Sequence, residues 1–355
     1  MRKILYLALF NSVVLLLVYT FSATLTSCTK EGPAGSAGAD GTDANSWCVV
    51  CHSYAKMDAV YAEYNTSLHG TGTSWEEEGS NKSCVACHSN QGYVETYYSG
   101  EDTMAVVNPF PESITCDGCH YNHVTLDSSN YDYALRVRDG FRLRMDSSFV
   151  TLNGIGNTCG RCHQARVPSP YLDPVNFQST TDSIKPGNWR FGTHYGVAAN
   201  IFAGKGFNFP GTLAYENSDH CTAADCGDCH MADANGTLYG GHTWRVKAEN
   251  GTENVAACIK CHTGDTSFDI GGKQTEIAAL IQELGNKLYD TYGVLEKVDG
   301  EFTGYMFPEN ATTYKVSYTV AAAVINFQLA FRDKSNGVHN YKYTKALLRN
   351  TIDAI

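Results

Sequence analysis

The stretch Cys226-Gly227-Asp228-Cys229-His230 contains the pattern that decides how this chain folds. Two cysteines separated by two residues and followed at once by a histidine occur six times in 355 residues. In chain order, the first to the sixth motif are Cys48-Cys51-His52, Cys84-Cys87-His88, Cys116-Cys119-His120, Cys159-Cys162-His163, Cys226-Cys229-His230 and Cys258-Cys261-His262. The chain between the motifs is expected to wrap around whatever they bind.

The spacing fits one kind of cofactor. Two thiols at this separation can add to the two vinyl groups of a haem, and the next residue then lies where its imidazole can bind the iron. Zinc is an alternative, because paired Cys-x-x-Cys units also form tetrahedral sites. A disulfide framework is another, in an oxidising compartment. Neither explains a histidine after every pair, so the motifs predict six covalently bound haem c groups.

The chain holds 12 histidines, and the six outside the motifs match the number of predicted haems. Six-coordinate iron needs a second axial ligand, so the match predicts bis-histidine ligation. A surface or core role is the alternative for each histidine. The predicted second ligands are His69, His123, His194, His220, His242 and His339, and the alternative ligands are Met57, Met104, Met145, Met231 and Met306. His123 lies only three residues after His120, so we expect it to serve a different haem.

The amino end reads as an export signal. Arg2 and Lys3 precede an apolar run, and Leu25-Thr26-Ser27-Cys28 resembles the lipobox of bacterial lipoproteins. Residues 1–27 are thus predicted to be a signal peptide and Cys28 to be lipidated, with an uncleaved membrane anchor as the alternative. Glycine at every third position from Gly32 makes 28–46 a predicted tether rather than a collagen-like helix. We expect an exported protein, lipid-anchored to the outer membrane and facing the periplasm or the cell surface.

The rest of the chain changes character near residue 270. Residues 47–268 show little sustained periodicity and are predicted to form a multihaem domain. Residues 269–355 contain apolar positions at helical spacing, from Ile277 to Leu295, then an almost wholly apolar run from Val316 to Phe331 and a third run from Tyr341 to Ile352. The predicted fold class is mainly α with extensive loops around six haems, with a helical carboxyl-terminal region that packs on haems or forms a dimer.

The net charge and the cysteines outside the motifs bear on the expected partners. A formal net charge of −11 has the wrong sign for binding a phosphate backbone, so nucleic acid is excluded as an expected partner. Of the 14 cysteines, only Cys28 and Cys221 lie outside the motifs. Cys221 is an odd thiol, for which burial, a haem contact and an intermolecular bridge all stay open.

Several segments resemble a known superfamily. They are Thr193-His194-Tyr195-Gly196, the fifth motif with Met231, Gly240-Gly241-His242-Thr243, and Gly337-Val338-His339-Asn340 with Tyr343 and Leu347-Leu348. These segments are similar to the multihaem superfamily of cytochrome c nitrite reductase, hydroxylamine oxidoreductase and octahaem reductases. The resemblance implies a mostly helical fold, haems in stacked and perpendicular pairs, and long carboxyl-terminal helices that often form a dimer. The chain departs from the family in having no Cys-x-x-Cys-Lys motif.

Three functions compete. If every spare histidine is a ligand, no iron is open to substrate, which favours an electron carrier that exchanges electrons with other cytochromes or an external acceptor. A terminal reductase of a small nitrogen or sulfur compound would need one open haem and nearby cations, for which Arg136, Arg138, Arg142, Arg144 and Arg161 are candidates. A polymeric cytochrome filament would share histidines between subunits. No catalytic residue is predicted, and whether the chain has a substrate of its own stays open.

Overall fold

The computed structural model describes residues 48–125, 132–179, 181–187, 189–306 and 315–355. The predicted signal peptide, the lipidation site Cys28 and the tether lie outside them. The chain divides into two compact units, one ending at Met57 and one covering Asp58–Ile355. Within the described ranges, no helix is both long and apolar enough to cross a bilayer. The domain boundary predicted between 268 and 269 stays a prediction.

In the first unit, residues 48–52 are helical and carry the first motif. Cys48, Cys51 and His52 are exposed there. The helix α3 (Tyr54–Tyr64) follows. The first motif is therefore accessible for cofactor attachment.

The motifs of the second unit each form about one helical turn. They lie on α6 (Val85–His88), α8 (Cys116–Cys119), α9 (Gly156–Gly160) and the turn that follows it, α12 (Cys226–His230) and η4 (Cys258–Lys260). The histidine N–H donates to the carbonyl of the first cysteine, for example at 3.1 Å from His88 to Cys84 and 2.7 Å from His262 to Cys258. This helical bond brings both cysteines and the histidine within one turn.

The other short helices lie between the motifs or shortly after the sixth one. They are α4 (Leu68–Thr71), α5 (Ser74–Glu78), α7 (Asn90–Ser99), α10 (Ala198–Phe202), α11 (His220–Ala223), η3 (Gly241–Thr243) and η5 (Ile270–Gly272). In the described ranges, the strands form antiparallel pairs of two residues each: β1 (Phe141–Arg142) with β2 (Phe149–Val150), β3 (Ser183–Ile184) with β6 (Val316–Ser317), and β4 (Lys297–Val298) with β5 (Glu301–Phe302). The fold is mainly helical with extensive loops, as predicted.

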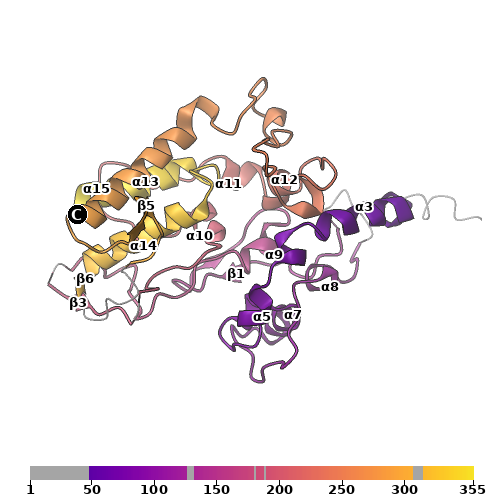
Figure 1. Cartoon of the computed structure of the whole chain (residues 1–355), viewed down its shortest axis with the longest axis horizontal. Coiled ribbons are helices and arrows are strands. Elements are labelled where there is room, and N and C mark those ends of the chain that lie inside the picture. The colour runs from indigo at the N-terminus through magenta and orange to yellow at the C-terminus, as the bar shows by residue number, and fades with distance from the viewer. Residues whose placement is uncertain (1–47, 126–131, 180, 188, 307–314) are drawn as a thin grey trace, which may run out of the picture. The chain divides into compact units, whose positions relative to one another are not determined.

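Three longer helices form the carboxyl-terminal part and pack side by side (Figure 1). They are α13 (Lys273–Asp290), α14 (Tyr318–Asp333) and α15 (Tyr341–Ala354). Ser317 caps α14 by accepting a hydrogen bond from the Val320 N–H. All three predicted helices are confirmed. However, α13 ends before Val294 and Leu295, because Gly293 takes a positive φ of 63°, and both residues fold back into the core.

Buried amides on these helices hold the loops that have no sheet to pair with. Asn326 on α14 donates to the Phe207 carbonyl at 2.7 Å, and Gln328 donates to that of Phe191 at 3.0 Å. Asn340, directly before α15, donates to the Ile201 carbonyl at 3.0 Å. Each amide satisfies a backbone group that would otherwise be buried without a partner. The helices thereby share one core with apolar residues of the loop region between Met145 and Phe209.

Candidate haem-binding sites

Five histidines of the motifs each face one histidine from outside the motifs. The ring centroids are 6.1 Å apart for His69 and His163, 6.4 Å for His88 and His194, 6.3 Å for His120 and His242, 6.0 Å for His220 and His262, and 6.2 Å for His230 and His339. All five distances fall within 0.4 Å of one another. Such uniformity across five separate loops indicates a common geometric requirement.

The size of the separation fits two imidazoles on opposite sides of one metal. Histidine nitrogen binds a transition metal at about 2.0 Å. With ring bonds of about 1.3 to 1.4 Å, the ring centre lies roughly 1.2 Å behind that nitrogen. Two ligands in line therefore have centroids about 6.4 Å apart. Direct stacking or a hydrogen bond between the rings would bring them closer.

Hydrogen bonds at Nδ1 orient several of these rings. His120, His220 and His230 place Nδ1 at 2.8, 2.8 and 2.9 Å from the carbonyl oxygens of Tyr133, Val338 and Trp244 respectively. A carbonyl can only accept, so Nδ1 carries the proton and Nε2 keeps its lone pair. This is the tautomer that a histidine bound to iron through Nε2 needs.

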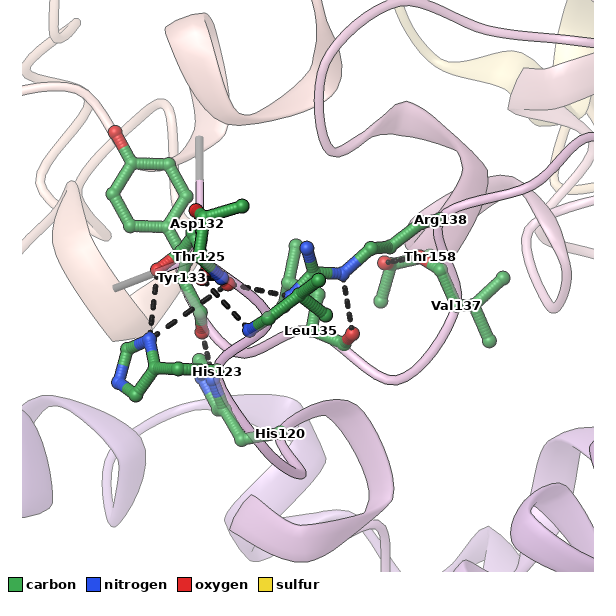
Figure 2. A network of polar contacts seen from close by, with 10 residues as sticks. His120, His123, Thr125, Asp132, Tyr133, Leu135, Val137, Arg138 and Thr158 are labelled. Atoms are coloured by element: carbon green, nitrogen blue, oxygen red, sulfur yellow. Dashed lines mark hydrogen bonds and ion pairs between the residues drawn. The ribbon is translucent and has the colours of Figure 1, made fainter. Parts of the chain in front are cut away.

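The segment that orients His120 also orients His123 (Figure 2). The carbonyl of Asp132 accepts from His123 Nδ1 at 3.0 Å. The Asp132 carboxylate is buried and accepts from the backbone N–H of Val124 at 2.8 Å and from Arg138 Nη2 at 2.6 Å. The buried carboxylate thus fixes the loop whose consecutive carbonyls direct both histidines.

His339 has a different partner. Its Nδ1 lies 2.7 Å from Oδ1 of Asp333, whose side chain is 2% exposed. Burial would by itself lower the pKa of His339, but the negative carboxylate outweighs it and the pKa is raised. The carboxylate favours a strongly polarised Nδ1–H bond, which makes Nε2 a better electron donor.

His163 and His194 lie in the opposite electrostatic setting. The pKa of each is lowered to about 4, first because desolvation by the surrounding protein disfavours the imidazolium. Neighbouring cations add to this effect at His194, where Arg166 is the largest of them. Both rings are therefore neutral at physiological pH, which is the state that binds a metal.

Trp244 contacts the ligands of more than one candidate site. Its ring centroid lies 4.6 Å from that of His69 and 5.4 Å from that of His242, and its carbonyl accepts from His230. The buried Glu63 accepts from the backbone N–H of His242 at 2.8 Å. Trp244 therefore contacts one candidate ligand in each of three candidate sites.

Gly241, next to His242, has a φ of 52°, and a Cβ there would lie 2.3 Å from Glu63 Oε2. Gly241 thus lies against the Glu63 carboxylate. Its small size is what lets Glu63 reach the His242 backbone.

Thiols of different motifs lie against one another. The Cys87 thiol interacts with that of Cys162, which lowers the pKa of Cys87 and raises that of Cys162. Cys159 and Cys226 interact in the same way. None of the described cysteines forms a disulfide. In the part of the chain that is described, no three or more His, Cys, Asp or Glu side chains are grouped to hold a bare metal ion.

The other sequence candidates have ordinary structural surroundings. Met145 and Met306 lie in the apolar core. The Cys221 thiol lies 3.7 Å from the His339 carbonyl oxygen, and burial raises its pKa to about 11, so it is protonated. The five arginines considered for a reductase site make contacts with backbone carbonyls or carboxylates, at Arg136, Arg138, Arg142, Arg144 and Arg161.

The residues that sequence reasoning missed are those around the ligands. Asp333, Glu63, Trp244 and Arg332 belong to no motif, and no spacing marks them. They are brought to the histidines only by packing. The predicted ligand roles of all 12 histidines stay predictions, and His52 and His123 do not belong to the five facing pairs.

No protein-family model matches this chain, and no curated protein does. Among solved structures, the crystal structure of "Outer Cell Wall Cytochrome OcwA" is similar at 19% identity with a TM-score of 0.49. The similarity covers 83% of this chain and 50% of that one, so this chain spans about half the length of its neighbour. At that identity and score, no property passes from one chain to the other. The interpretation of the sites rests on the motifs and the paired rings.

Proposed function

We propose that this chain is a hexahaem c-type cytochrome that transfers electrons through bis-histidine haems at the cell envelope or surface. The observation that supports it best is the set of five histidine pairs, each joining a motif histidine to a non-motif histidine at 6.0 to 6.4 Å. Haem iron supplies reversible one-electron chemistry when bound in such a site. The first motif, with the same spacing, brings the total to six haems.

The pairing also supplies what holds the loops together. His69 comes shortly before the second motif but faces His163 of the fourth, and His220 comes just before the fifth motif but faces His262 of the sixth. His339 faces His230 from more than 100 residues away. Each haem would therefore hold two distant segments together. Bound haem would thus stabilise loops that no regular sheet connects.

Contacts between motifs favour rapid transfer from haem to haem. Thioether bonds attach a haem at the edge of its macrocycle. Because the thiols of Cys87 and Cys162 interact, the haems of the second and fourth motifs would be edge neighbours. The pair Cys159 and Cys226 makes the fourth and fifth haems neighbours as well. The proposed order in space is second, fourth, fifth, which differs from the order along the chain.

Filled axial positions favour a carrier over a reductase. In the five pairs, both sides of the iron would be taken by imidazole, which leaves no position for nitrite or sulfite. The partners proposed are other redox proteins or an external acceptor. Export and lipid anchoring through Cys28 are proposed from the sequence of the amino end.

The test uses the exported protein as purified. Its intact mass should exceed that of the polypeptide by six haem masses, and low-temperature electron paramagnetic resonance of the oxidised protein should show low-spin iron only. Cyanide should leave the spectrum unchanged. A mass excess of fewer than six haems would refute the motif interpretation. A high-spin, cyanide-sensitive signal would favour the reductase instead.

The same spectrum can test the individual pairs. The ring planes are nearly perpendicular for three pairs, at 73°, 71° and 87°, and closer to parallel for His120 with His242 and His230 with His339, at 34° and 33°. Parallel imidazole planes interact with one of the two iron dπ orbitals more than with the other. Perpendicular planes interact with both orbitals alike. Two groups of low-spin signals are therefore expected, with the more anisotropic group arising from the perpendicular pairs.

A further inference from the structure

The buried side-chain nitrogen and oxygen atoms without any hydrogen-bond partner gather at one place. In the described part of the chain, they are Thr193 Oγ1, His194 Nδ1 and Arg332 Nε. Buried polar groups are almost always satisfied, so each of these atoms calls for a partner. An arginine Nε is a donor only, and the hydroxyl and imidazole can both donate. The group that would satisfy all three is an acceptor.

Hydrogen bonds through α14 show that these atoms lie together. Arg332 Nη2 and Gln328 Nε2 donate to the same carbonyl, that of Gly304, at 2.8 and 3.0 Å. Gln328 Oε1 in turn accepts from the N–H of Thr193 at 2.9 Å. Arg332 is also among the cations that lower the pKa of His194. One helix thus connects all three unpartnered donors.

A second guanidinium adds to the positive charge. Arg166 is the largest cationic influence on His194, and it also lowers the pKa of Arg332, after burial. Arg166 donates to the Gly192 carbonyl at 3.3 Å and to that of Arg190. In the described residues, neither Arg166 nor Arg332 has a carboxylate within ion-pair distance, and Glu78 acts on Arg166 only from farther away.

Two tyrosine rings offset only part of the cost of burying the positive charge of Arg332. The guanidinium carbon lies 5.1 Å from the ring centroid of Tyr195 and 5.4 Å from that of Tyr305. Arg332 is 5% exposed, and its pKa is lowered to about 10, mainly by burial. A buried charge without a counterion is costly, and aromatic faces offset only a fraction of that cost.

We infer that Arg332, Arg166, Thr193 and His194 bind an oxyanion beside the His88 and His194 pair. Its source is a propionate carboxylate of the haem held by this pair, an assignment that rests on the proposed function. A haem bound there would bring its own propionate carboxylates, which are acceptors of the kind that these donors need. A free oxyanion such as nitrite or sulfate is the other source of the same chemistry.

The experiment compares holoprotein, freed of added oxyanions, with its Arg332→Gln and Arg166→Gln variants. Haem content and low-spin spectra are measured first, and they test the proposed function independently. Spectroelectrochemical titration then resolves the component potentials. Loss of a cation that balances a propionate should stabilise ferric iron, so one haem should shift to a lower potential. The expected change is about tenfold in the ratio of reduced to oxidised iron at a fixed applied potential.

Two controls make the result decisive. Arg349→Gln removes the same charge from a surface arginine paired with Glu283, and it should leave every potential unchanged. Addition of nitrite or sulfate should not move the potentials of the wild type if the propionate fills the site. A saturable shift with either anion in the wild type, absent from Arg332→Gln, would assign the site to a free oxyanion. Full haem content with unshifted potentials in both arginine variants, and no anion effect, would overturn the inference.

Discussion

His339 and His194 are two half-buried histidines from outside the motifs that face motif histidines at nearly the same distance, 6.2 and 6.4 Å. Their surroundings carry opposite charge. His339 hydrogen-bonds to the carboxylate of Asp333, whereas His194 lies among arginines and has no partner at Nδ1. The same ligand geometry is thus combined with two electrostatic settings. The haem at His339 should therefore be the more reducing of the two.

One helix end produces this contrast. Arg332 and Asp333 are consecutive residues in the last turn of α14. Neighbours on a helix point about 100° apart, so Arg332 is directed to His194 and Asp333 to His339. A single element thereby sets the environment of two proposed haems, and each environment can be changed by one substitution.

The largest effect is expected from removing either ligand. His339→Ala and His194→Ala should each convert one haem to high spin and open it to cyanide, because the thioether bonds keep the haem in place without its second ligand. The change is measured by electron paramagnetic resonance and absorption with and without cyanide. Cys221→Ser, beside the His339 carbonyl, and Thr193→Val, beside His194, should stay low-spin. An unchanged, fully low-spin spectrum in either alanine variant would show that the replaced histidine is not a haem ligand.

A smaller effect is expected from the carboxylate. Asp333→Asn removes the negative charge that polarises His339, so the potential of the haem shared by His230 and His339 should rise, by on the order of tenfold in the redox ratio at fixed potential. The haem count and the low-spin spectrum should not change. Asp353→Asn, a surface carboxylate near Arg349, is the matched control. If Asp333→Asn and Asp353→Asn give the same haem potentials, the difference in charge between the two sites does not set those potentials.

The smallest effect is expected from Ser335. Its hydroxyl donates to the Asp333 carboxylate, and so draws charge away from the bond to His339. Ser335→Ala should shift the same haem in the opposite direction, to a lower potential, by roughly two- to threefold in the redox ratio. The same redox titration measures it. A shift in the same direction as that of Asp333→Asn would mean that the serine acts by positioning His339 and not through the carboxylate.

The elements that depend on local pattern could be predicted from the sequence. Ile277, Leu280, Ile281 and Leu284 recur at helical spacing, and α13 buries all four. The almost wholly apolar run that ends at Phe331 becomes the buried helix α14. The Cys-x-x-Cys-His spacing needs no tertiary information either, since both thiols and the imidazole lie within one turn.

The sequence by itself determined the number of candidate motifs, the matching number of spare histidines and the three long helices. Only the tertiary structure decided that His69 faces His163 and that Asp333 and Arg332 lie beside different histidines. Partner choice depends on loops whose path is set by long-range packing, and a single aspartate or arginine has no periodicity that would mark it. Charges near a site act through space, so their effect on a histidine can be predicted only when the positions of distant segments are known.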